Sequence, residues 1–404
     1  MNRRNFISIV LVSVMSMSGC SNHIELNDLG ITTATGFDRQ NGKWNITYQI
    51  ITPPASSANG TSTGGSQAPV DTFSSEGKTI PEALARSSVK NSKKLYFAHS
   101  SVILIGEGAA KYGIAEIMDH YFRNIGLRET VKVIIADGEA KEYLEKLIPP
   151  EKHPGRALSE ILERNQEEGA FYPVMNLHEI GLKITSDSGS AGIPTLTMPR
   201  PANNMNSIDS FKQTSTTGKL RIDGLSVFKR DKIVGVLNQK ESLGISWLTD
   251  RVKRTNLSYV GENGEINSFN VRKANIKVIP IKSGRHYNVQ VNAKVEAELD
   301  ESTSKKDLTS SHTISELEQQ AEQTIKAQIL LGWQANQRLH VDMLGIANRI
   351  HQRDPQDWKK MKDHWPQELA QMDIQINVDV SLKKVGLLQD SFSKMLQSDS
   401  SEQD

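Results

Sequence analysis

The chain has 404 residues, with 48 basic and 47 acidic side chains and a formal net charge of +1. Because bulk nucleic-acid binding needs a dense positive face, this balance argues against a nucleic-acid partner. The length allows two or three domains. The single cysteine excludes an internal disulfide, so packing alone is expected to hold the core.

The first twenty residues have the layout of a secretory signal peptide. Arg3 and Arg4 precede an apolar and small-residue stretch, 6–17, which is too short for a membrane span of about 20 residues. Ser18-Gly19-Cys20 follows and resembles the lipobox of bacterial lipoproteins. We therefore expect a signal peptide at 1–19, cleavage between Gly19 and Cys20, and a diacylglycerol on the Cys20 thiol. An unmodified thiol beside a simple cleavage site is the alternative.

Strand and helix patterns alternate in the region that follows, which predicts an N-terminal α/β domain over residues 20–190. Within it, residues 53–69 are rich in Ser, Gly and Thr and predict a mobile loop. Buried strands are expected at 100–105 and 131–136, with a helix at 109–121 between them.

The second half of the chain is expected to hold two further domains. Gly, Ser, Pro and Asn dominate residues 191–218, which predicts a linker. A middle domain is expected at 219–268, with a short helix at 239–248. A C-terminal domain at 269–390 contains a long predicted helix, 315–350, and a polar tail completes the chain at 391–404. The fold class is therefore α+β: a three-domain body of mixed and antiparallel sheets with packed helices.

Two motifs suggest chemistry but lack the context that it needs. Gly106-Glu107-Gly108 follows a predicted strand, as in dinucleotide-binding loops. The third glycine of that fingerprint would fall at Lys111, so a plain strand-to-helix turn is the better interpretation. Residues 188–192 have the composition of a nucleophile elbow, but no predicted strand leads into them.

Metal binding is not predicted either. His340 and His351 lie on one predicted helix, eleven residues and about 16 Å apart, which is too far for one metal ion. With no catalytic, cofactor-binding or metal-ligating residue identified, the chain is not expected to be an enzyme.

Four stretches in a fixed order carry a family resemblance. They are Glu25 to Leu29 leading to Thr35-Gly36-Phe37-Asp38; His99 to Glu107 with Gly113-Ile114 and Tyr121-Phe122-Arg123; Gly224 to Gly235; and Trp358 to Lys362 with Trp365. Together they resemble the Ger(x)C family of spore germination lipoproteins.

The resemblance implies a lipid-anchored, non-catalytic C subunit of a spore germinant receptor, on the outer face of the spore inner membrane. The implied partners are two integral membrane subunits, an A-type subunit and a permease-like B-type subunit. A solute-binding lipoprotein of an importer remains an alternative, although no duplicated halves are apparent. A cell-wall hydrolase is a further alternative.

The distance from the lipid to the body is short. Residues 21–29 span at most about 32 Å when fully extended, so the first domain must lie near the lipid headgroups. Because the chain is nearly neutral and no basic amphipathic helix is predicted at this end, we expect a protein partner to fix its orientation.

Overall fold

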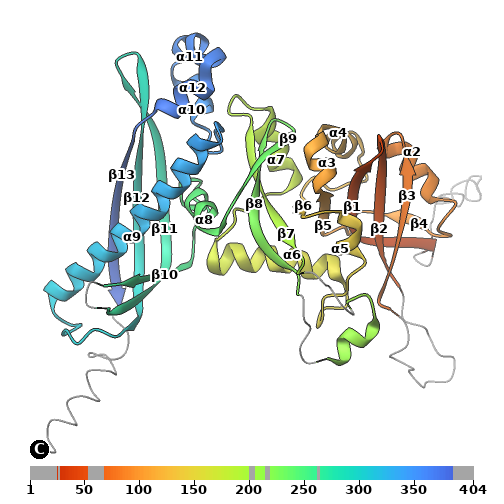
Figure 1. Cartoon of the computed structure of the whole chain (residues 1–404), viewed down its shortest axis with the longest axis horizontal. Coiled ribbons are helices and arrows are strands. Elements are labelled where there is room, and N and C mark those ends of the chain that lie inside the picture. The colour runs from red at the N-terminus through yellow and green to blue at the C-terminus, as the bar shows by residue number, and fades with distance from the viewer. Residues whose placement is uncertain are drawn as a thin grey trace, which may run out of the picture.

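The computed structural model describes residues 25, 28–52, 68–199, 205–213, 219–261 and 264–384. These residues form two β-sheets with helices packed against them (Figure 1). The nine-stranded sheet has the order β3-β2-β1-β5-β6-β7-β8-β9, with β4 beside β1, and the four-stranded sheet has the order β10-β11-β12-β13. Parallel and antiparallel pairs occur in both, so the predicted α+β class is confirmed. No helix within the described ranges is long and apolar enough to cross a membrane.

The nine-stranded sheet is built from the first part of the chain. Its strands are β1 (Leu29–Gln40), β2 (Lys43–Ile51), β3 (Val70–Gly77), β4 (Lys94–Tyr96), β5 (Val102–Gly106), β6 (Lys132–Ala136), β7 (Ser190–Thr197), β8 (Arg221–Lys229) and β9 (Lys232–Leu237). The associated helices are α2 (Ile80–Ser87), α3 (Glu107–Tyr112), α4 (Ala115–Arg123), α5 (Ala140–Leu144), α6 (Pro154–Arg164), the π-helix η2 (Asn165–Gly169), α7 (Leu177–Thr185) and the 3₁₀ helix η3 (Ile208–Lys212).

Strand β5 explains why the sheet has helices on both faces. Ile103 and Ile105 belong to the core cluster that contains α2, α3, α4 and α7, whereas Val102 and Leu104 belong to the cluster that contains α5 and α6. A central strand covered on both faces needs apolar side chains at every position, which accounts for the uninterrupted run at 102–105. The expected order of strand, helix and strand at 100–136 is therefore confirmed, but the single helix expected at 109–121 is two helices, α3 and α4, separated at Gly113, which has a φ of 136°.

The segment expected to be a linker is corrected at its start. Residues 190–197 form β7, which is mostly buried and pairs in parallel with β6 and antiparallel with β8. Proline cannot donate a hydrogen bond to a neighbouring strand. Pro194 is tolerated in β7 because it lies opposite Leu225 of β8, just before the short pairing with β6 at Thr195 and Leu196. The domain boundaries themselves remain predictions. The signal peptide, most of the 53–69 loop and the 391–404 tail lie outside the described residues.

The four-stranded sheet packs one face against a long helix. Its strands are β10 (Thr255–Val260), β11 (Ile266–Ser283), β12 (His286–Ser302) and β13 (Ile374–Lys384), and the helix is α9 (Ser311–Arg338). Alternate residues of β12 from Tyr287 to Leu299 are buried in the same cluster as Leu317, Ile325 and Trp333 of α9. The apolar side chains that alternate along the strands and those that recur at helical spacing along α9 therefore form one hydrophobic core.

The long predicted helix ends earlier than expected. Instead of reaching residue 350, α9 ends at Arg338, His340 has a φ of 50°, and α10 (Ile346–Arg353) begins after Gly345 at φ 77°. Both residues adopt the left-handed conformation, which interrupts a helix. Three short helices then follow: α11 (Pro355–Met361), the 3₁₀ helix η4 (Lys362–His364) and α12 (Trp365–Gln371).

Helix α8 (Gln239–Leu248), found at the bounds predicted from the sequence, joins the two sheets by packing on α9. The two helices contact each other at Gly244 and Gly332. A Cβ added to Gly332 would lie only 2.4 Å from the carbonyl carbon of Gly244. Trp247 Nε1 donates to Gln328 Oε1 at 2.8 Å across the same contact. Only glycine at these positions lets the backbones approach so closely.

Candidate functional site

The predicted lipidation and cleavage positions, Cys20 and Gly19, lie outside the described residues, so both remain predictions. In the part of the chain that the structure describes, a cluster of polar side chains joins the nine-stranded sheet to the C-terminal helices. We call it the joint, formed by loop 186–190 and residues 340–351. The loop leads from α7 into β7, and the second segment leads from α9 into α10.

Asp342 is the centre of the joint. Its side chain is 2 % exposed and accepts hydrogen bonds from the backbone N–H groups of Ile346 (3.0 Å) and Ala347 (2.8 Å), at the start of α10. It also accepts from Ser188 Oγ at 2.7 Å. A buried carboxylate needs several donors, and these three supply them from both sides of the joint.

Further contacts hold the same two segments together. Asn348 Oδ1 accepts from the backbone N–H of Ser188 at 3.1 Å, and His351 Nδ1 lies 2.7 Å from Asp187 Oδ2. Lys183 of α7 donates to the carbonyl of Met343 at 3.1 Å, and burial lowers the pKa of this lysine. The joint therefore fixes α10 against the sheet at several points.

A pocket of about 320 Å³ opens beside the joint. Its lining includes Arg230, His340 and Lys362 together with Trp358 and Trp365, whose rings meet edge to face at 5.2 Å. Acidic residues, Asp187 and Asp363 among them, also line the pocket, so it combines charges of both signs with two indole rings. Ser188 and Asp342 also line the pocket and form a serine–carboxylate hydrogen bond, but Asp342 accepts at the same time from the backbone N–H groups of Ile346 and Ala347, so this pair has a structural role.

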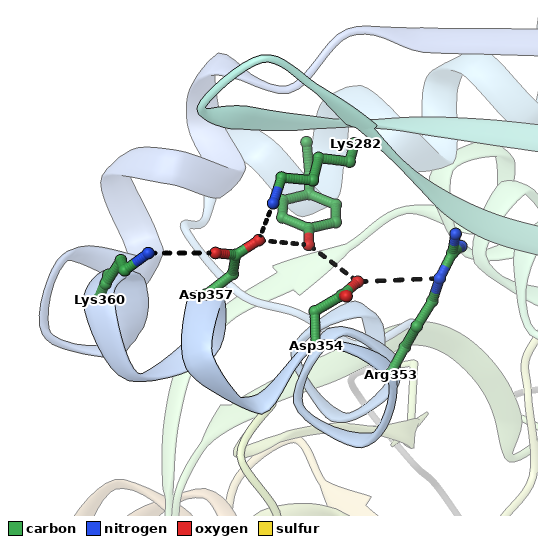
Figure 2. Close-up of polar contacts among 6 residues, drawn as sticks. Lys282, Arg353, Asp354, Asp357 and Lys360 are labelled. Carbon is green, nitrogen blue, oxygen red and sulfur yellow. Dashed lines mark hydrogen bonds and ion pairs between the residues drawn. The ribbon is translucent and has the colours of Figure 1, made fainter.

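A second polar network lies at the start of α11 (Figure 2). The buried Tyr287 hydroxyl lies between Asp354 Oδ2 (3.1 Å) and Asp357 Oδ2 (3.2 Å), and Lys282 forms an ion pair with Asp357. Burial, with donation to the Asp354 carboxylate, raises the pKa of Tyr287. Because Lys282 and Tyr287 flank the β11–β12 turn, the network fastens that turn to α11.

The motifs considered from sequence have structural roles. Gly106 ends β5, as expected for a strand-to-helix turn, and a Cβ there would lie 2.0 Å from Asp38 Oδ1. That carboxylate accepts from the backbone N–H groups of Ala140 (2.8 Å) and Lys141 (3.0 Å) at the start of α5. The glycine thus makes room for a helix-capping carboxylate rather than for a phosphate.

The two histidines do not share one helix, which corrects the sequence interpretation. His340 follows the end of α9, whereas His351 belongs to α10. No group of three or more potential ligands in the described ranges is arranged to hold a metal ion. Ser188 and Ser190 of the elbow-like segment bond to Asp342 and to the Ser188 carbonyl, respectively.

Sequence reasoning did not find the joint, although one signal for it was present. Asp342 stands three residues before Gly345, and an acidic residue ahead of an apolar stretch is a helix-start signal. The continuous helical period assumed up to residue 350 concealed it.

Two family models match the chain in sequence order. "Spore germination protein N-terminal domain" matches residues 22–198, and "Spore germination B3/ GerAC like, C-terminal" matches residues 223–386. The chain belongs to the Ger(x)C family of spore germination proteins. The predicted family is therefore confirmed.

Individual relatives match over almost the whole length. The chain is 27 % identical to spore germination protein KC of Bacillus subtilis (strain 168), over 94 % of this chain and 95 % of that protein. It is 22 % identical to spore germination protein B3 of the same organism, over 94 % of this chain and 97 % of that protein. Its fold is similar to the crystal structure of the GerBC protein, with a TM-score of 0.53 and 20 % identity over 86 % of this chain and 96 % of that chain.

Proposed function

We propose that this chain is a lipid-anchored, non-catalytic subunit of a spore germinant receptor, attached through Cys20 to the outer face of the spore inner membrane. It assembles there with two integral membrane subunits, one A-type and one permease-like B-type. The observation that carries the proposal is the pair of family matches, which cover residues 22–198 and 223–386.

Features of the chain support a non-catalytic protein that is attached to the membrane and acts by binding its partner subunits. The attachment is assigned to Cys20 because Ser18-Gly19-Cys20 resembles a lipobox. The polar clusters at Asp342 and Tyr287 are saturated by contacts within the chain, as expected of groups that stabilise a scaffold.

The alternative classes receive less support. A solute-binding protein needs two similar lobes around a cleft, whereas the two sheets here have nine and four strands in different orders. A hydrolase needs a nucleophile activated by a base, whereas Ser188 donates to the buried, helix-capping Asp342.

Exchange of the cysteine tests the anchor. In spores that lack both partner subunits, the wild-type chain should be recovered with the membrane and Cys20→Ala in the soluble fraction, with equal melting temperatures. Ser18→Ala, a change beside the cleavage position, is the matched control and should stay with the membrane. Full membrane retention of Cys20→Ala in that background would exclude the lipid anchor.

A further inference from the structure

A cluster of basic side chains lies beside the point at which the chain enters the first sheet. Strand β4 pairs in parallel with the start of β1, so that Leu29 is opposite Lys94 and Ile31 is opposite Tyr96. A Cβ on Gly30 would lie 3.5 Å from the Cβ of Lys93. We call residues 89–96 the basic edge.

The basic edge combines positive charge with exposed apolar surface. Residues 88–99 contain three lysines and one histidine but no acidic residue, in a chain whose formal net charge is only +1. Val89 is 85 % exposed and Tyr96 is 39 % exposed, and the Tyr96 ring packs on His99. Tyrosine is favoured where an apolar surface meets polar headgroups.

The charges of the basic edge are available to a partner. Lys94 is exposed and Lys93 is half-buried, and neither forms an ion pair with any described residue, including Glu25 and Asp28 just before β1. Lys90 donates to the carbonyl of Ser74 at 2.7 Å, which holds its positive charge at the surface of the same edge.

The tether brings the basic edge to a membrane. This step rests on the proposed lipidation of Cys20. Leu29 is the ninth residue after Cys20, so that the start of β1 lies at most about 32 Å from the lipid, and nearer 17 Å on average for a flexible chain of that length. At separations shorter than this average, the lysines next to Leu29 come within the Debye length of about 8–10 Å over which the surface field acts.

We propose that the basic edge docks on the headgroups of anionic phospholipids and thereby orients the anchored protein. Figure 1 shows β4 at the end of the long axis opposite β13. With β4 on the lipid surface, the four-stranded sheet points away from the membrane. Lipid contact then contributes to an orientation that, from the sequence, was expected to depend on a protein partner alone.

The loss of membrane binding expected on removing the lysines follows from the contribution of each one. A lysine near an anionic surface contributes about a fivefold gain in membrane partitioning, so removing two gives at least a 25-fold loss. Such a contact is weak alone but adds to a lipid anchor, because the tether keeps its local concentration high.

Vesicle co-sedimentation of the mature chain with Cys20→Ser, which carries no lipid, tests the basic edge by itself. The probes are vesicles of phosphatidylcholine alone and of phosphatidylcholine mixed with phosphatidylglycerol. The test variant carries Lys93→Glu and Lys94→Glu. The matched control carries Lys277→Glu and Lys294→Glu, a pair of exposed lysines on β11 and β12 in the other sheet.

The parent chain should bind the mixed vesicles, prefer them to phosphatidylcholine, and lose binding as salt rises. The Lys93→Glu/Lys94→Glu chain should bind at least 25-fold more weakly, and the control chain should bind like the parent, with unchanged melting temperatures for both. Equal binding of both variants, or no preference for the anionic vesicles, would overturn the proposal. Because this chain lacks Cys20, the result is independent of whether the lipid anchor exists.

Discussion

Glu322 of α9 accepts a hydrogen bond from the backbone N–H of Val380 at 3.2 Å, on the strand that ends the four-stranded sheet. One turn earlier, Glu318 accepts from the backbone N–H of Leu382 at 2.9 Å. The spacings match, since four helical residues rise about 6 Å and two strand residues about 6.6 Å. The helix therefore occupies donors of β13 that an extended chain would otherwise pair with.

Removing both carboxylates should open this edge. The Glu318→Ala/Glu322→Ala variant should lose about 1–3 kcal/mol of unfolding free energy, because two charge-assisted hydrogen bonds disappear. It should also self-associate at high concentration, since unpaired strand edges template pairing. Chemical denaturation and size-exclusion chromatography measure the two effects. Gln319→Ala/Gln323→Ala, the same spacing on an exposed part of α9, should change neither, and equal self-association of both variants would contradict the account.

Removing the buried carboxylate of Asp342 from the joint should reduce the unfolding free energy strongly. Asp342→Ala should cost about 3–5 kcal/mol of unfolding free energy, because it leaves the Ile346, Ala347 and Ser188 donors without their acceptor. Asp363→Ala, on the exposed rim of the neighbouring pocket, should cost less than about 0.5 kcal/mol. Urea denaturation measures both, and similar costs for the two variants would contradict the role assigned to Asp342.

The raised pKa of Asp38 implies that the stability of the protein depends on pH. Burial raises the pKa of Asp38 to about 6 although two backbone N–H groups bind it. A carboxyl whose pKa is raised on folding stabilises the protein fully below its unfolded pKa near 4, and this contribution is lost as the pH rises through 6. Relative to Asp38→Asn, which does not titrate, the wild-type chain should lose roughly 2 kcal/mol between pH 4 and pH 7. Parallel melting curves of the two chains that keep a constant difference over that range would refute the assignment.

The sequence predicted elements wherever a single local pattern decided the outcome. Helix α8 follows a capping Asn238 with Glu241 at the third position, and its observed bounds equal the predicted ones. The apolar run at 102–105 likewise indicated a buried strand. Local signals of this kind need no knowledge of distant segments.

The errors arose where distant contacts decide. Strand β7 contains Gly192 and Pro194, which favour loops, but pairing with β8 and β6 gives the segment a place in the sheet. The apolar positions after Arg338 continue a helical period, yet Asp342 caps a new helix there by bonding to Ser188 as well. Likewise, Lys93 and Lys94 are far from Cys20 in sequence, and only the pairing of β4 with β1 places them beside the tether.

Affinity purification of the tagged chain from detergent-solubilised spore membranes tests whether the chain is a receptor subunit. If the chain is a subunit of a germinant receptor, two multispanning membrane proteins should co-purify with it in constant ratio, one of them permease-like. Recovery of the chain alone, under conditions that keep a known germinant receptor of the same spores intact, would contradict the account.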